Sequence, residues 1–173
     1  MSLRARLTEA LILATVVVLD QLSKAVLQKS LELHEYRPVI EGLFSISHVR
    51  NRGAAFGILS DAGLPYQGEI LSLVSLGALL AIGAYAWKLP AEARLPRLAL
   101  AFVLGGAIGN LIDRVRFGYV VDFIHVYWNH HVWPDFNLAD SAISTGVVLL
   151  VIDMLRPARR AEPAPEPASG RTD

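Results

Sequence analysis

The sequence contains no cysteine, which excludes a disulfide framework, a thiol nucleophile and a thiolate metal site. It also lacks an excess of charge of either sign. Its 16 Lys and Arg residues balance 16 Asp and Glu residues, so the formal net charge is zero and no polyanionic partner such as nucleic acid is indicated. Any catalytic group must therefore be an oxygen or nitrogen side chain.

Apolar residues are what the chain has in abundance. They make up 53% of its 173 residues, charged residues make up only 18%, and the mean hydropathy is +0.42. This composition is too apolar for an ordinary soluble domain and excludes a disordered chain. A helix needs about 20 apolar residues to cross a bilayer. Four windows have about that length: Leu7 to Leu27, Ile70 to Trp87, Leu95 to Leu111, and Leu138 to Leu155.

The fold predicted from these windows is an all-α membrane protein with four transmembrane helices. Between the first two helices, residues 39–49 are rich in β-formers with a turn at Gly42, and the alternation of Phe44, Ile46 and His48 predicts a short strand with one face on lipid or protein. We expect one membrane domain over residues 1–156, with extracytoplasmic segments at 28–67 and 115–137, and a disordered, Pro-rich cytoplasmic tail at 157–173.

Basic residues near the span ends predict the orientation. They precede the first span, fill the turn between spans two and three, and follow span four: Arg4, Arg6, Lys88, Arg94, Arg97, Arg156, Arg159 and Arg160. The positive-inside rule then places both termini in the cytoplasm. The first span could instead be a cleavable secretory signal, but it leads into Asp20 without a small-x-small cleavage site, which disfavours that interpretation.

Polar residues within the spans gather at one depth. An ionisable group inside a bilayer costs about 2.5–3.5 kcal/mol, so each is a functional candidate. The inner halves of the spans hold few of them, with Asp153 as the main exception. Three spans place theirs near the outer end: Asp20, Lys24, Asn110, Asp113, Arg114, Asn137 and Asp140. The sequence therefore predicts a single site in the outer leaflet.

Structural explanations compete with chemical ones for several of these residues. Asp20 and Lys24 are one helical turn apart and could form an ion pair that only joins helices. Arg114 could reach toward lipid phosphates. Small residues recur on spans three and four and predict close helix packing that brings the polar groups together: Ala101, Gly105, Gly109, Ala142 and Gly146.

Asp122 and Asp140 are the strongest candidates for catalysis. Both are predicted at the outer interface, and two carboxyl groups in a partly dehydrated site cannot both ionise easily, so one becomes an acid and the other a base. Such a pair can activate water and polarise a carbonyl group. The alternatives are that Asp140 is the N-cap of span four and that Asp122 is a solvated loop carboxylate.

Other site types have weaker support. His130 and His131 near Asp135 lack the helical spacing of metal ligands, and a serine triad lacks its GxSxG motif. No metal or other cofactor is expected. A small transporter or channel remains the rival class, and a polar path that continued to the cytoplasmic side would favour it. An intramembrane aspartyl protease of the GxGD type lacks its motif.

Five ordered sequence blocks resemble the bacterial lipoprotein signal peptidases, also called signal peptidase II. The resemblance covers the chain from about Leu19 to Arg156. The blocks are Asp20-Gln21-Leu22-Ser23-Lys24, Asn51-Arg52-Gly53-Ala54-Ala55-Phe56, the run from Gly105 to Arg114, Val121-Asp122-Phe123, and Phe136-Asn137-Leu138-Ala139-Asp140-Ser141. Arg52 stands where the family commonly has Thr, which could alter the approach of a substrate.

The resemblance implies an aspartyl endopeptidase of the bacterial inner membrane, with a small β-rich extracytoplasmic cradle between the first two helices, here residues 39–49. Such an enzyme cleaves diacylglyceryl-modified prolipoproteins before the lipidated Cys of their lipobox, among membrane lipids, and is inhibited by globomycin. Asp122 and Asp140 match the catalytic pair of the family. The resemblance further implies residues that bind substrate or support the pair: Asn51, Gly53, Asn110, Arg114, Asn137, Asp20 and Lys24. It does not indicate which aspartate is the base.

Overall fold

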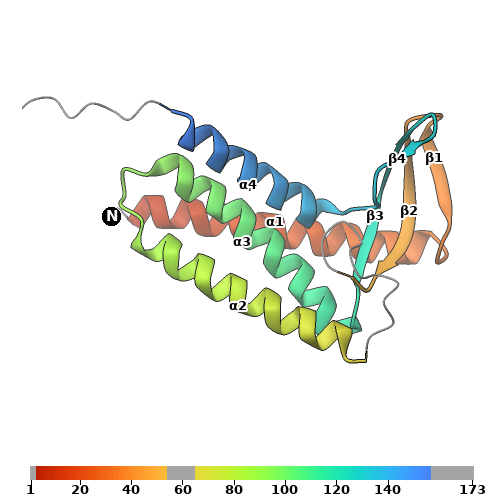
Figure 1. Cartoon of the computed structure of the whole chain (residues 1–173), viewed down its shortest axis with the longest axis horizontal. Helices are drawn as coiled ribbons and strands as arrows, with labels where there is room; N and C mark the ends of the chain where they lie inside the picture. Colours follow the sequence, from red (N-terminus) through yellow and green to blue (C-terminus); the bar gives the residue numbers. More distant parts are fainter. Residues whose placement is uncertain (1–2, 54–64, 157–173) are drawn as a thin grey trace, which may run out of the picture.

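The computed structural model describes residues 3–53 and 65–156 of the chain. The predicted tail at 157–173 and the apolar run after Gly53 lie outside these residues. The elements in chain order are α1 (Leu3–Ser30), β1 (Tyr36–Ile40), β2 (Phe44–Asn51), α2 (Gln67–Lys88), α3 (Arg94–Phe117), β3 (Val120–Trp128), β4 (His131–Val132) and α4 (Leu138–Met154). Figure 1 shows the helices side by side along the long axis and the strands together at one end.

The protein is mostly helical with a small antiparallel sheet, as the sequence predicted. Within residues 3–53 and 65–156, three helical stretches are long and apolar enough to cross a membrane: Arg6–Ser30, Gln67–Lys88 and Arg94–Phe117. The fourth helix, α4, is the shortest, with 17 residues. Helix α3 continues beyond its predicted end at Leu111, until Gly118 ends it in the left-handed conformation with φ 75°.

The sheet differs from the prediction in its origin. Its strand order is β1-β2-β3-β4, and all neighbours are antiparallel, so the segment before α4 contributes two of the four strands. The predicted turn at Gly42 is present with φ 78°. The expectation of a cradle built only between the first two helices was therefore incomplete. Strand β3 pairs with β2 from a distant part of the sequence, and no local pattern reports such pairing.

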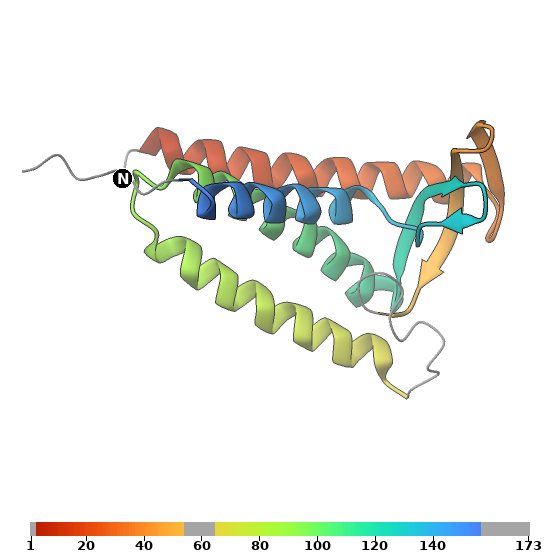
Figure 2. The same ribbon diagram turned by 45° about the horizontal axis from the view of Figure 1, so that its top comes forward.

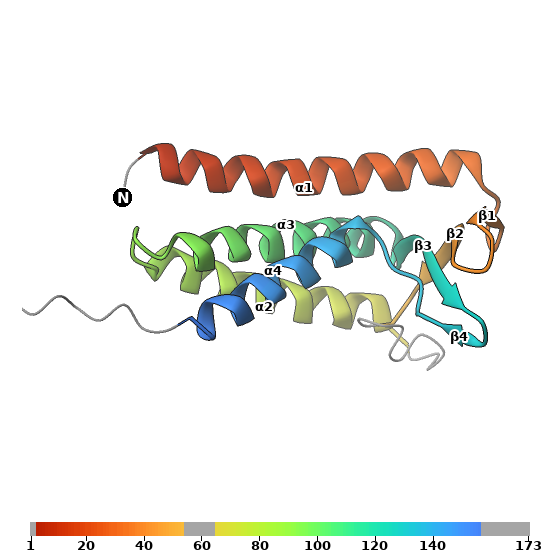
Figure 3. The same cartoon turned by 90° about the horizontal axis from the view of Figure 1, so that it is seen from above.

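Helix α3 lies at the centre of the bundle and contacts the other three helices. Figure 2 shows α2 diverging from α1 along the bundle, and Figure 3 shows α1 running its whole length toward the sheet. The predicted small residues allow close packing: a Cβ on Gly105 would lie 2.9 Å from Cβ of Val16 on α1, and a Cβ on Gly146 would lie 2.5 Å from the carbonyl oxygen of Ala99 on α3.

The sheet is joined to the bundle by a small apolar cluster. Leu27 and Leu31 at the end of α1 pack with Val121 of β3, and Ile46 of β2 lies against them. Burial of these side chains removes apolar surface from water and holds the sheet against the end of α1. As a result, β3 runs beside the ends of α1, α3 and α4, where the predicted polar residues gather.

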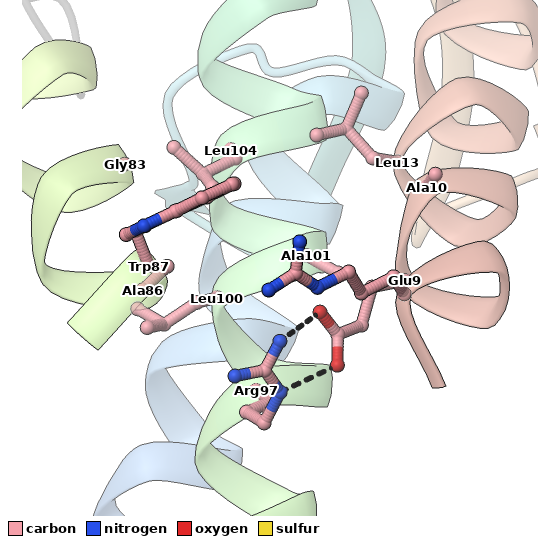
Figure 4. Close-up of a pocket in the computed structure, with 11 residues that line it drawn as sticks. Glu9, Ala10, Leu13, Gly83, Ala86, Trp87, Arg97, Leu100, Ala101 and Leu104 are labelled. Carbon is pink, nitrogen blue, oxygen red and sulfur yellow. Dashed lines mark hydrogen bonds and ion pairs between the residues drawn. The ribbon is translucent and has the colours of Figure 1, made fainter. Parts of the chain in front are cut away.

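An ion pair joins α1 to α3 at the opposite end of the bundle. The guanidinium of Arg97 donates to both carboxylate oxygens of Glu9 at 2.6 Å, and Arg97 is buried. Figure 4 shows the two side chains facing each other, with Trp87 of α2 across a cavity of about 340 Å³. The sequence interpretation overlooked Glu9. The main inner-half exception that it named, Asp153, has no part in this pair.

Candidate active site

The polar residues predicted on separate elements meet where the helices adjoin the sheet. Strands β2 and β3 contribute Asn51 and Asp122, α1 contributes Asp20 and Lys24, α3 contributes Asn110 and Arg114, and the start of α4 contributes its N-cap Asn137 and its third residue Asp140. A network of hydrogen bonds and ion pairs connects most of them.

Asn137 contacts both candidate catalytic carboxylates. Its side-chain Nδ2 donates to Oδ1 of Asp122 at 2.7 Å, and its backbone N–H donates to Oδ2 of Asp140 at 3.2 Å. Asn137 is the N-cap of α4, and its Oδ1 accepts from the backbone N–H of Asp140 at 2.9 Å. The two residues thus form a capping box, which stabilises the start of the helix.

Both structural alternatives for the two aspartates were wrong. Asp140 is not the N-cap of α4 but its third residue, the N3 position of the capping box, so its carboxylate reaches back toward Asn137. Asp122 is not a solvated loop residue, because it lies on β3 with only 1% of its surface exposed. The strand and the helix start bring the two carboxylates to a shared asparagine.

Three asparagine side chains have their orientation determined by a partner that can only donate. Oδ1 of Asn51 accepts from the Gly53 N–H at 2.8 Å, Oδ1 of Asn110 accepts from Lys24 Nζ at 3.0 Å, and Oδ1 of Asn137 caps α4. The Nδ2 groups must then point the other way. They donate to carboxylates: Asn51 to Asp122 at 3.0 Å and Asn110 to Asp140 at 2.7 Å.

Lys24 is the buried cation of the network. Its Nζ lies 2.9 Å from Asp20 and 3.0 Å from Asp113, so the predicted pair on α1 is present and also includes α3. Gln21 donates to Asp113 at 2.9 Å, and Asp20 accepts the backbone N–H of Ala139 on α4 at 3.0 Å. This cluster joins three helices behind the asparagines.

Sequence reasoning did not foresee the roles of Asp113 and Gln21. Asp113 was expected only among the polar residues near the outer ends of the spans, yet it pairs with Lys24 and accepts the backbone N–H of Val121 on β3 at 3.1 Å. The sequence did hold a hint of these roles, because Gln21 is adjacent to Asp20 and Asp113 is adjacent to Arg114, two residues already predicted to belong to the site.

Arg114 turns inward and does not simply extend toward lipid. Its Nη2 donates to the carbonyl oxygen of Gly53 at 3.0 Å. It lines a cavity of about 310 Å³ between α2, α3 and α4, together with Asn51, Asn110 and Asp140. A carboxylate, two amides and a guanidinium thus face one concave space, a form typical of a ligand or substrate site.

Burial raises the pKa of Asp122 to about 7, from an ordinary value near 3.8. The negative charge of Asp140 contributes further, and hydrogen bonds from Asn51 and Asn137 oppose the shift. A neutral Asp122 also reduces the excess of negative charge in the cluster, where four carboxyl groups accompany two cations. The four acids are Asp20, Asp113, Asp122 and Asp140, and the cations are Lys24 and Arg114. Such a pair can supply one acid and one base near neutral pH.

Comparison with known proteins gives consistent matches along most of the chain. The family model described as signal peptidase (SPase) II matches residues 12–156. A lipoprotein signal peptidase of Geobacter sulfurreducens is 48% identical over 158 residues, which cover 91% of this chain and 97% of that protein. The corresponding protein of Geobacter metallireducens is 46% identical over 87% of this chain and 92% of its own length.

A solved structure has the same fold. It is described as a bacterial membrane enzyme structure by the in meso method at 2.3 Å resolution. It superposes with a TM-score of 0.76 and 32% sequence identity, over 86% of this chain and 87% of the other. A second structure with a matching description, at 1.9 Å, has a TM-score of 0.73 and 31% identity, over 86% of this chain and 93% of its own.

Proposed function

The chain belongs to the signal peptidase II family, and we propose that it removes signal peptides from prolipoproteins as an aspartyl endopeptidase with Asp122 and Asp140 as its catalytic pair. Family membership supports the protease activity and its substrate class. The aspartyl chemistry depends on one observation, the contact of Asn137 with both carboxylates, of which Asp140 lines the cavity.

In the proposed reaction, Asp122 holds the proton and Asp140 acts as the general base. Ionised Asp140 takes a proton from water, and the water oxygen attacks the carbonyl carbon of the scissile peptide bond. Asp122 donates its proton to the carbonyl oxygen as the tetrahedral gem-diol forms. Asp140 then gives its proton to the leaving nitrogen while ionised Asp122 takes back a proton from a gem-diol hydroxyl, so that the C–N bond breaks, a carboxyl group and an amine are released and both aspartates return to their starting states. The raised pKa of Asp122 supports this assignment of acid and base.

The amides and Arg114 serve this pair in different ways. Asn51, Asn110 and Asn137 donate to the carboxylates and stabilise whichever is ionised. Arg114 lines the cavity and donates to the carbonyl oxygen of Gly53, and these two residues bind the substrate backbone or its polar groups. Lys24 and Asp20 hold the asparagine of α3 and the start of α4 in place.

The proposed substrate carries a diacylglyceryl-modified cysteine, and cleavage occurs just before that residue. Its acyl chains lie among the membrane lipids, so the scissile bond is held near the headgroup level.

In the proposed topology all four helices span the inner membrane, both termini are cytoplasmic and the site is near the outer face. Helix α4 is about 26 Å long at 1.5 Å per residue. Residues 1–156 form the single membrane domain, followed by the tail at 157–173.

The rival class, a transporter or channel, would need polar groups across the bundle. On α3, the buried residues between Arg97 and Asn110 are Ala, Leu, Val and Gly. These buried apolar residues lie between the ion pair of Glu9 with Arg97 and the cavity that Arg114 lines. A one-sided site fits a hydrolase better than a transport path.

Incubation of the purified protein with a lipidated precursor peptide tests the proposal. We expect cleavage before the lipidated cysteine, identified by mass spectrometry, and inhibition by globomycin. The same peptide without the lipid is the control for substrate class. Lack of cleavage of the lipidated peptide by a folded preparation would contradict the proposed activity.

A further inference from the structure

Another carboxylate borders the active-site cavity, on the segment between β4 and α4. Asp135 lines this cavity but has no part in the catalytic pair or in the asparagine network. Its Oδ1 accepts a hydrogen bond from Ser47 Oγ at 2.7 Å and lies 3.1 Å from Nδ1 of His125. The side chains of Asp135 and His125 are each only 16% exposed.

The segment that carries Asp135 runs antiparallel to β3. Trp133 N–H donates to the carbonyl of Val126 at 2.9 Å, and Phe136 N–H donates to the carbonyl of Ile124 at 3.2 Å. The next residue is Asn137, the N-cap that contacts both catalytic carboxylates. A displacement of this segment would therefore move the asparagine and the first turn of α4.

The backbone pairing that holds this segment is short. Strands β3 and β4 share two residue pairs, and Ile124 with Phe136 forms an isolated bridge. Pro134 has no N–H and cannot donate to β3. Asp135 supplements this pairing, because its carboxylate binds Ser47 on β2 and His125 on β3 at once.

We propose that Asp135 is a positioning residue of the peptidase, which holds the start of α4 in place through its contacts with Ser47 and His125. The proposal rests on the proposed function for its kinetic test. The proposal assigns the Asp135 carboxylate a structural role in the sheet, although Asp135 also borders the cavity. A role in which the charge of Asp135 contacts the substrate directly is the alternative that the experiment must separate.

Four variants separate these roles: Asp135→Ala, Asp135→Asn, Ser47→Ala and the double variant Ser47→Ala with Asp135→Ala. Cleavage of the lipidated peptide is measured as kcat and KM. For Asp135→Ala we expect kcat to fall by roughly tenfold with little change in KM, because misplacement of catalytic groups by a fraction of an ångström slows the chemical step. His131→Ala, an exposed residue of β4, is the control and should leave both constants unchanged.

The conservative variant Asp135→Asn distinguishes a positioning role from direct contact with the substrate. Asp135→Asn keeps an oxygen that can accept from Ser47, so it should retain most of the parent kcat. Adding Ser47→Ala to Asp135→Ala should cost little more, because both remove the same contact. A KM increase with equal losses for Asn and Ala would instead mean that the charge binds substrate, and would overturn the proposal. Full activity of Asp135→Ala would overturn it as well.

Amide hydrogen exchange gives a readout that does not depend on activity. In Asp135→Ala, the peptide spanning residues 133–137 should exchange at least tenfold faster, whereas a peptide from the centre of α3 should not change. Unchanged exchange would contradict a positioning role. An inactive parent enzyme with faster exchange in the variant would refute the proposed peptidase function and leave the positioning contact intact.

Discussion

Lys24 determines which way Asn110 faces. The ammonium Nζ lies 3.0 Å from Oδ1 of Asn110, and because an ammonium only donates hydrogen bonds, the oxygen must face Lys24. The Nδ2 group is then directed to Oδ1 of Asp140 at 2.7 Å. A buried cation on α1 thus acts on the proposed base of α4 through an amide on α3.

Replacement of Lys24 by Met should destabilise the protein strongly. The change leaves Asp20 and Asp113 buried beside each other without their cation, and loss of one partner from a buried ion pair costs about 3–5 kcal/mol. We expect a lower midpoint of thermal unfolding in detergent and a loss of cleavage. Lys29→Met, at an exposed position in the last turn of α1, is the matched control. Equal midpoints for the two variants would contradict the buried role of Lys24.

Replacement of either proposed catalytic aspartate by asparagine should abolish cleavage while the protein remains folded. General acid–base groups contribute roughly 10²–10⁴-fold to rate, so Asp122→Asn and Asp140→Asn should each lose at least that much. Asp153→Asn, at the opposite end of α4, is the control and should cleave like the parent. Substantial activity in either dyad variant would show that the pair is not catalytic.

Asn137 serves both the helix and the catalytic pair, and two substitutions separate these functions. Asn137→Ala removes the N-cap and the donor to Asp122, so it should cost about 1 kcal/mol of stability as well as activity. Asn137→Ser restores a capping oxygen but not the amide donor. We expect the serine variant to regain thermal stability and to remain slow in cleavage. Recovery of both properties by serine would exclude a catalytic contribution from the amide.

Cleavage should decline as pH rises through about 7, because Asp122 loses the proton that it supplies to the carbonyl oxygen. The fold should also lose stability as pH rises from about 4 to about 7, and this loss should level off above about pH 7. The pKa of Asp122 is raised in the folded state, so the protonated form is favoured there and its ionisation opposes folding. The first statement is tested by the cleavage rate of the parent as a function of pH. The second is tested by the midpoints of thermal unfolding of the parent and of Asp122→Asn as a function of pH. The variant should lose this pH dependence of stability, and a parent rate that is constant from pH 6 to 9 would contradict the assigned acid.

Gly106 lets α3 approach α4 closely. A Cβ at this position would collide with the backbone carbonyl oxygen of Ala139 and lie 2.8 Å from Ile143. Gly106→Ala should therefore separate the helices, lower the unfolding midpoint and reduce cleavage. Gly77→Ala on α2 is the control, because nothing lies within 4 Å of its added carbon. A neutral effect of Gly106→Ala would mean that the two helices can separate without loss.

Local sequence patterns were sufficient for much of the fold. The apolar windows correspond to α1, α2, α3 and α4, and the turn at Gly42 lies between β1 and β2. Small residues at every fourth position marked the close helix contacts. These features follow from hydrophobicity and backbone freedom, which act over a few neighbouring residues.

Other features were not foreseen, because their partners are far apart in the chain. Strand β3 pairs with β2, which brings Val49 opposite Asp122, although the sequence suggested a loop there. Glu9 pairs with Arg97, 88 positions away. The Ser47 contact with Asp135 also spans 88 positions, so no pattern within either segment could reveal it.

The sequence by itself determined that the chain is a membrane protein whose carboxylates, amides and Arg114 lie toward one end of its apolar windows, because the cost of burying charge restricts where such residues occur. Its motifs also singled out Asp122 and Asp140. Only the tertiary structure decided how these groups face each other. Amide orientation, the burial that raises the pKa of Asp122 and the shared contacts of Asn137 depend on the packing of distant segments, and side-chain identity alone does not specify that packing.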